Sequence, residues 1–120
     1  MRIIKPIQVE REDVRASLFT GLVSRQTIIP KGTSESFNMS IVNFPRGIRN
    51  KFHAHTSDQI LIVTAGNGIV ATEEKEYAVA EGDIIHIPAG EKHWHGAGDG
   101  SDFSHMTILA VGGKLTQLEE

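Results

Sequence analysis

The chain has 120 residues, of which 39% are hydrophobic and 22% charged, a composition that predicts one domain over 1–120 and excludes disorder as the main state. The formal net charge is −3 and the basic residues are scattered, so the sequence has no electrostatic footprint for nucleic acid. There is no cysteine, which excludes disulfides, thiolate metal sites, iron–sulfur clusters and cysteine nucleophiles.

The first element expected in chain order is a short helix over Arg11 to Leu18, with Asp13 as its cap. After it come short apolar or alternating stretches that are typical of β-strands. These predicted strands are 21–29, 36–44, 51–55, 59–64, 69–72, 77–79, 83–87 and 103–111. Turn residues such as Gly66-Asn67-Gly68 separate them, and the acidic segment 73–76 is expected to be a solvated hairpin tip. The pattern predicts one all-β domain, either a sandwich or a closed barrel.

Neither a membrane span nor an export signal is expected. The longest aliphatic run, Ile60 to Val63, is far too short to cross a bilayer. The first six residues are too few and too broken to form a signal peptide, which favours the cytoplasm. An apolar segment near the start, with isoleucines at 3, 4 and 7 and valine at 9, would be a liability if exposed on a small barrel. We therefore expect it to pair with a second subunit in a homodimer.

The six histidines all lie between positions 53 and 105. His53 and His55 stand two residues apart in a predicted strand, so both side chains face one side, about 7 Å apart along the strand. His93 and His95 repeat this spacing after a Pro-x-Gly turn. A single pair is usually an incidental polar strand end, but two pairs around one hairpin can converge on a metal ion. Imidazoles suit Zn, Cu, Ni and Fe, and an oxygen ligand extends the range to Mn.

The spacing of the glycines, the proline and the histidines resembles the two motifs of the cupin family. Gly47-x5-His53-x-His55-x3-Gln59-x6-Gly66 is similar to the first motif, and Gly82-x5-Pro88-x-Gly90-x2-His93 is similar to the second. The short gap from Asn67 to Glu81 is of the kind that small microbial cupins have. This match covers about half of the chain directly, and it implies a cupin barrel, a double-stranded β-helix or jelly roll. It also implies that His53, His55, Gln59 and His93 are metal ligands.

Gln59 departs from most cupins, which have a ligating glutamate at this position. A neutral amide leaves the charge of the cation uncompensated, so the metal should bind more weakly and polarise a bound oxygen more strongly. The alternative interpretation is a lost ligand and a site without metal. The segments 19–21, 61–66, 90–97 and 104–106 resemble a subgroup of short bacterial cupins that hold manganese with three histidines and a glutamine. This subgroup includes the cupin hydroxynitrile lyases, so the resemblance implies Mn, with Fe, Ni or Zn as alternatives.

The resemblance implies a lyase acting on a small α-hydroxynitrile or a similar hydroxy or carbonyl compound. Four protein ligands would leave two positions of a six-coordinate ion for this substrate, and the metal would lower the pKa of its hydroxyl. His95 and His105 are the candidate general bases, because the pKa of an ordinary imidazole lies near neutral pH. His105 could instead be a buried, hydrogen-bonded residue, and His95 could orient a ligand. The residues expected to line the substrate cavity are Ser40, Val42 and Leu61.

Two other functions stay open on the sequence. Three histidines on Fe(II) can bind oxygen beside a chelating substrate, so a metal-dependent dioxygenase is the first alternative. A cupin that binds a small ligand without catalysis is the second. His86 alternates with Ile85 and Ile87 and is expected to be a packed or surface residue outside the site.

Overall fold

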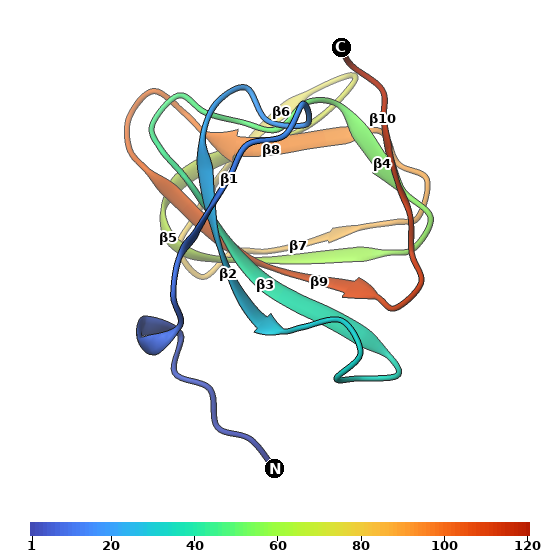
Figure 1. Cartoon of the computed structure of the whole chain (residues 1–120). Helices are drawn as coiled ribbons and strands as arrows, with labels where there is room; N and C mark the ends of the chain where they lie inside the picture. The colour runs from blue at the N-terminus through green and yellow to red at the C-terminus, as the bar shows by residue number, and fades with distance from the viewer.

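The computed structural model describes residues 1–120 and shows a β-sheet curled round an interior (Figure 1). The elements are η1 (Pro6–Gln8), β1 (Glu12–Val14), β2 (Val23–Ile29), β3 (Phe37–Phe44), β4 (His53–His55), β5 (Gln59–Thr72), β6 (Glu76–Ala80), β7 (Ile84–Ile87), β8 (His93–Ala97), β9 (Phe103–Ala110) and β10 (Leu115–Gln117). The strand order is β1-β2-β3-β9-β5-β8-β4-β10, and β6 and β7 each pair only with β5. This architecture confirms the predicted all-β barrel. No helix in it is both long enough and apolar enough to span a membrane.

β5 is a single strand of 14 residues, so the prediction of two strands divided by a turn at Gly66-Asn67-Gly68 is wrong. Its first half pairs with β7 and β9, and its second half pairs with β6 and β8. The bend between the halves lies where the register shifts after Val63 and where Gly66 has a φ of 74°. A Cβ atom at Gly66 would overlap the carbonyl oxygen of Asp102. Glycine therefore lets the strand turn a corner here without ending.

The helix predicted over Arg11 to Leu18 is also wrong. Glu12–Val14 form β1, which pairs antiparallel with β2 and places Glu12 opposite Arg25. This pairing satisfies the backbone groups of β1 in an extended conformation, and it overrides a weak helix propensity. The only helical element is one 3₁₀ turn, η1, at Pro6–Gln8.

Both ends of the chain lie on the outside of the barrel (Figure 1). β10, which the sequence did not predict, pairs with β4 and fastens the C-terminal segment beside the first histidine pair. Arg49 strengthens this attachment by donating hydrogen bonds of 3.1 and 2.8 Å to the carboxylate of Glu119. The N-terminal segment extends away from the barrel, with Ile3 83% and Ile7 95% exposed. Its contact with β2 includes hydrogen bonds that the Gln26 amide donates to the carbonyls of Pro6 and Val9.

The hydrophobic core packs against the polar site. Its fully packed members are Val23, Phe44, Val63, Ala97 and Phe103. The ring of Phe44 also packs against two imidazoles, with centroid distances of 6.1 Å to His95 and 5.5 Å to His105. Apolar packing thus fixes the position of these two histidines.

Candidate metal centre

Three imidazoles from two neighbouring strands converge inside the barrel. His53 and His55 project from β4 on the same face, and His93 stands directly opposite His53 on β8. One ring nitrogen from each residue lies within 4.8 Å of those of the other two. His53 and His93 are buried and His55 is half-buried, so the cluster is largely removed from solvent. A group of this kind can hold a metal ion.

Backbone carbonyls set the orientation of two of these rings. The Nδ1–H of His53 donates to the carbonyl of Lys51 at 2.7 Å, and the Nδ1–H of His93 donates to that of Glu91 at 2.8 Å. A carbonyl can only accept, so Nδ1 carries the proton in both rings and Nε2 carries a lone pair. Metal-binding histidines are commonly fixed through their other nitrogen in this way.

The amide of Gln59 completes a set of lone pairs that fits a cation. Its Nε2 donates to the hydroxyl of Thr107 at 2.8 Å, which turns Oε1 toward the interior. Oε1 then lies 3.1 Å from Nε2 of His93. With Nδ1 of His93 protonated, both of these facing atoms are acceptors and no hydrogen lies between them. A metal ion in contact with both atoms would remove this mismatch. The approach of these two acceptors is therefore the observation that shows the residues fit the expected metal.

The local environment keeps the imidazoles neutral, as metal ligands must be. Burial, followed by repulsion from His93, lowers the pKa of His53 to about 3. The same two causes lower the pKa of His55 to about 4. Burial also lowers the pKa of His93, although the hydrogen bond to Glu91 opposes this. Near neutral pH, protons therefore do not compete with a metal for these nitrogens.

The two candidate bases form a hydrogen-bonded pair beside the cluster. Nε2 of His105 lies 2.9 Å from Nδ1 of His95, and the ring of His95 stacks on that of His93 at a centroid distance of 5.5 Å. The backbone N–H of His95 donates to Oδ1 of Asn50 at 2.8 Å. Nδ1 of His105 is buried without a partner. This pair links β8, which carries His93, to β9.

The pKa values of this pair differ from the near-neutral ones expected from the sequence. Burial, followed by repulsion from His105, holds the pKa of His95 well below its usual value. Burial also lowers the pKa of His105 to about 4. Both rings are therefore neutral proton acceptors, but weaker bases than an exposed imidazole.

A cavity of about 170 Å³, here called the metal cavity, is lined by His53, His55, Gln59, His95 and His105, whereas His93 does not line it. Ser40 and Val42 from β3, two of the three residues expected to line a substrate cavity, are among its lining residues. Leu61 does not line it. Gln59, Leu61 and Val63 share one buried face of β5, and the fully buried Leu61 belongs to the core instead of the cavity wall.

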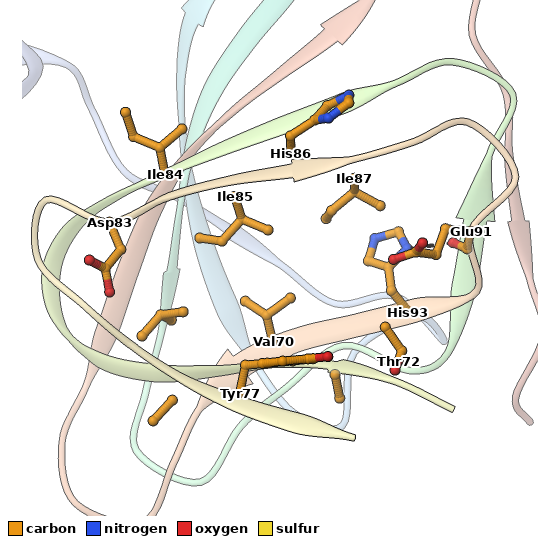
Figure 2. A pocket seen from close by; sticks show the side chains of 13 residues that line it. Val70, Thr72, Tyr77, Asp83, Ile84, Ile85, His86, Ile87, Glu91 and His93 are labelled. Atoms are coloured by element: carbon orange, nitrogen blue, oxygen red, sulfur yellow. Dashed lines mark hydrogen bonds between the residues drawn. The ribbon is translucent and has the colours of Figure 1, made fainter. Parts of the chain in front are cut away.

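A larger space of about 530 Å³, here called the apolar pocket, lies between β6 and β7 (Figure 2). Eight of its 13 lining residues are hydrophobic, among them Ile85 and Ile87. His93 reaches its edge beside Glu91, but Nε2 of His93 is the atom that faces Gln59. Of the four candidate ligands, the apolar pocket therefore borders His93 alone, and the metal cavity is lined by the other three.

His86 is an exposed residue outside the metal cavity, in agreement with the surface alternative. Its Nε2 lies 2.8 Å from a carboxylate oxygen of Asp58. The other oxygen of Asp58 accepts the backbone N–H of Ala89 at 2.9 Å. Asp58 thus ties the loop before Gln59 to the loop before His93.

Sequence reasoning missed three residues that build the site: Asn50, Thr107 and Arg25. Thr107 could have been found, because it is two residues beyond His105 and shares its inward face. Asn50 contacts a residue 45 positions away, and no local pattern marks that contact. Arg25 lines the metal cavity from β2, a strand in which no chemistry was expected.

Comparisons with known proteins agree with this geometry. A family model described as a cupin domain matches residues 40–115. The chain is 36% identical over 96 residues to an (R)-mandelonitrile lyase of Granulicella tundricola, covering 78% of this chain and 72% of that protein. It is 35% identical over 69 residues to an acireductone dioxygenase of Acidiphilium cryptum, but this covers 52% of the chain and only 38% of the dioxygenase.

Solved structures resemble the chain over nearly its whole length. A cupin-like protein from Thermotoga maritima superposes with a TM-score of 0.86 at 29% identity, covering 94% of this chain and 89% of that one. A polyketide cyclase from Streptomyces resistomycificus gives a TM-score of 0.88 at 17% identity, covering 100% and 87%, which is a likeness of fold alone. The family match spans the histidine cluster and the strands that carry it. The chain therefore belongs to the cupin family.

Proposed function

We propose that this cupin is a metal-dependent lyase that cleaves a carbon–carbon bond in a small α-hydroxynitrile or a similar hydroxy or carbonyl compound. The observation that carries the proposal is the convergence of His53, His55 and His93 within 4.8 Å, with the oxygen of Gln59 facing His93. The similarity to a mandelonitrile lyase over most of the chain favours this reaction class. The metal cavity, at about 170 Å³, suits a small substrate.

Four side chains would hold the metal: His53, His55, Gln59 and His93. Three imidazoles with one amide oxygen suit manganese, and iron, nickel or zinc are alternatives. A divalent cation held here would supply Lewis-acid polarisation of a substrate oxygen. The protein contributes no carboxylate to this set, so it offsets none of the charge of the cation.

His95 and His105 would move the proton. One of these neutral imidazoles takes the hydroxyl proton of the substrate, and the oxygen forms a carbonyl as the bond to the nitrile carbon breaks. The electron pair of that bond leaves with cyanide, which then receives the proton from the imidazolium. The products are a carbonyl compound and hydrogen cyanide. The hydrogen bond of 2.9 Å between the two rings would orient His95 and share the positive charge while it exists.

The second candidate function is a metal-dependent dioxygenase. It is favoured by the similarity to an acireductone dioxygenase over 52% of the chain. Three histidines with open positions on Fe(II) can bind oxygen beside a chelating substrate. Oxygen consumption by the iron-loaded protein with a diketone or an aromatic diol would support this function over the lyase.

Elemental analysis of the purified protein, followed by a hydroxynitrile cleavage assay without oxygen, tests the primary proposal. We expect a divalent metal in the wild type and much less in the His53→Ala and Gln59→Ala variants. We also expect release of cyanide by the manganese form and none by metal-stripped protein. A metal-loaded protein with no turnover above that control would contradict the lyase and favour a role in ligand binding.

We also propose that the chain forms a homodimer through the segment that carries Ile3 and Ile7, acts in the cytoplasm and folds as one domain over 1–120. The exposure of both isoleucines supports the dimer, because apolar side chains left in water cost free energy. Sedimentation of the wild type as a monomer would contradict the dimer. Two separate unfolding transitions would contradict the single domain, and cell fractionation tests the location.

A further inference from the structure

The metal cavity adjoins a second space of about 370 Å³, here called the outer groove. Arg25, Ser40 and Leu109 line both, so the two share a wall. The strand register shows where Arg25 points: it stands opposite Val42 on β3, and Val42 stands opposite His105 on β9. Opposite residues share a face of the sheet, and two strand spacings separate Arg25 from His105 by about 10 Å. Arg25 therefore lies on the interior face of the sheet at the entrance to the metal cavity, where it is exposed to solvent.

The permanently charged side chains that line the metal cavity and the outer groove are all cationic. No aspartate or glutamate lines either the metal cavity or the outer groove, whereas Arg25 and Lys31 are cationic. Arg25 makes no ion pair, although Glu12 is its register partner on β1. The guanidinium of Arg49, by comparison, binds Glu119 through both of its nitrogens. An unpaired guanidinium above a site of neutral ligands favours an anion in the space between them.

The outer groove contains a second unsatisfied group, on Asn38. Its Oδ1 is buried and has no hydrogen-bond partner. A buried acceptor without a donor costs free energy, which a ligand carrying a hydroxyl or an N–H would recover. Arg25 and Asn38 thus offer a donor and an acceptor on the wall of the same groove.

We propose that the substrate carries a carboxylate, which Arg25 binds, while its hydroxyl or carbonyl end enters the metal cavity. The substrate is thus a small hydroxy or carbonyl compound, as in the proposed function, that also carries a carboxylate. Guanidinium and carboxylate form paired charge-assisted hydrogen bonds, which fix orientation as well as affinity. The inference rests on the proposed function, because the metal site defines which end of the substrate reacts.

Matched probes of equal shape and different charge test this role of Arg25. We would titrate manganese-loaded protein calorimetrically with 4-hydroxybutyrate and 4-hydroxybutyramide, and with lactate and lactamide as a shorter pair. We expect at least one acid to bind about tenfold more tightly than its amide. Arg25→Gln should abolish the preference, Arg25→Lys should retain part of it, and Arg15→Gln, an exposed arginine outside both spaces, should leave it unchanged. Equal binding of acid and amide, a preference that survives Arg25→Gln, or no binding of either acid at millimolar concentration would overturn the proposal.

Measuring the metal content distinguishes failure of the proposed role of Arg25 from failure of the proposed function. Arg25 lies outside the ligand set, so Arg25→Gln should keep its metal and its melting temperature. If the wild type binds no metal, the lyase proposal fails, and the same titrations on the metal-free protein still measure the preference for acids. If metal-loaded protein cleaves neutral hydroxynitriles and Arg25→Gln cleaves them equally well, without any preference for acids, only the role of Arg25 fails.

Discussion

The metal cavity and the apolar pocket share no lining residue and differ in size and chemistry. The apolar pocket is about three times larger, at about 530 Å³ against 170 Å³, and its wall is mostly aliphatic. The metal cavity has the smaller volume but contains imidazole and amide lone pairs that are fixed by hydrogen bonds to the backbone and to Thr107. The larger volume is therefore not what marks the proposed site. The proposal rests on the convergence of oriented hydrogen-bond acceptors.

The two spaces also differ in how their ionisable side chains are arranged. Asp83, Glu91 and His86 at the apolar pocket stand apart from one another at its edge (Figure 2). The imidazoles of the metal cluster are within 4.8 Å of one another, and their pKa values are lowered by burial and by mutual repulsion. A ring that is costly to protonate presents its lone pair to a metal instead. Burial thus favours metal binding at the cluster of His53, His55 and His93, whereas the apolar pocket holds no such cluster.

Removing a candidate ligand should give the largest effect, a loss of metal affinity that no change at the apolar pocket reproduces. His53→Ala deletes an imidazole from the centre of the cluster, and we expect metal affinity to fall on the order of a hundredfold or more. Elemental analysis after dialysis against a weak chelator measures this loss. His86→Ala is the matched control, because it removes an exposed histidine at the apolar pocket. Equal metal loss in both variants would remove the distinction between the regions.

A substitution at the bend of β5 should destabilise the metal cavity and the apolar pocket together. The first half of β5 supplies Gln59 to the metal cavity, and the second half supplies Val70 to the apolar pocket. Gly66→Ala adds a Cβ against the carbonyl of Asp102 at a positive φ, and we expect a loss of about 3 kcal/mol in unfolding free energy.

Chemical denaturation measures that loss. Gly100→Ala is the control, because nothing lies within 4 Å of a Cβ there, and it should change stability by less than about 0.5 kcal/mol. Similar stability of the two variants would mean that the bend does not require glycine.

The candidate ligands could be predicted from the sequence because their spacing is local. His53 and His55 share a face through the two-residue period of a strand, and the motif supplied Gln59 and His93. The pairing of Asn50 with His95 depends on how the barrel closes, and no sequence period encodes it. The bend at Gly66 was misread for a related reason. Glycine marks both the end of a strand and a corner within one, and only the position of Asp102 distinguishes the two.

Acid should destabilise the metal-free protein through the histidines of the metal cavity. The pKa of His105 falls to about 4 and that of His53 to about 3 on folding, from an ordinary 6.5. The unfolded chain therefore binds more protons between about pH 6.5 and pH 4, so stability is complete above this window and falls as the pH falls through it. Denaturation at a series of pH values measures the slope.

Manganese should oppose this loss by binding only the folded, neutral imidazoles, which raises the melting temperature near neutral pH. A stability that stays constant from pH 7 to pH 4 would contradict the neutral, buried state of the cluster.

The smallest effect should come from the rim of the apolar pocket. Ile84 lines this pocket and is 69% exposed, so Ile84→Ser removes little buried area and should change the unfolding free energy by less than about 0.5 kcal/mol. It should leave metal content and cyanide release at the wild-type level, because Ile84 does not line the metal cavity. Parallel elemental analysis and cleavage assays measure both. A clear loss of metal or turnover would show that the apolar pocket belongs to the reaction site, and the distinction between the two spaces would then have to be abandoned.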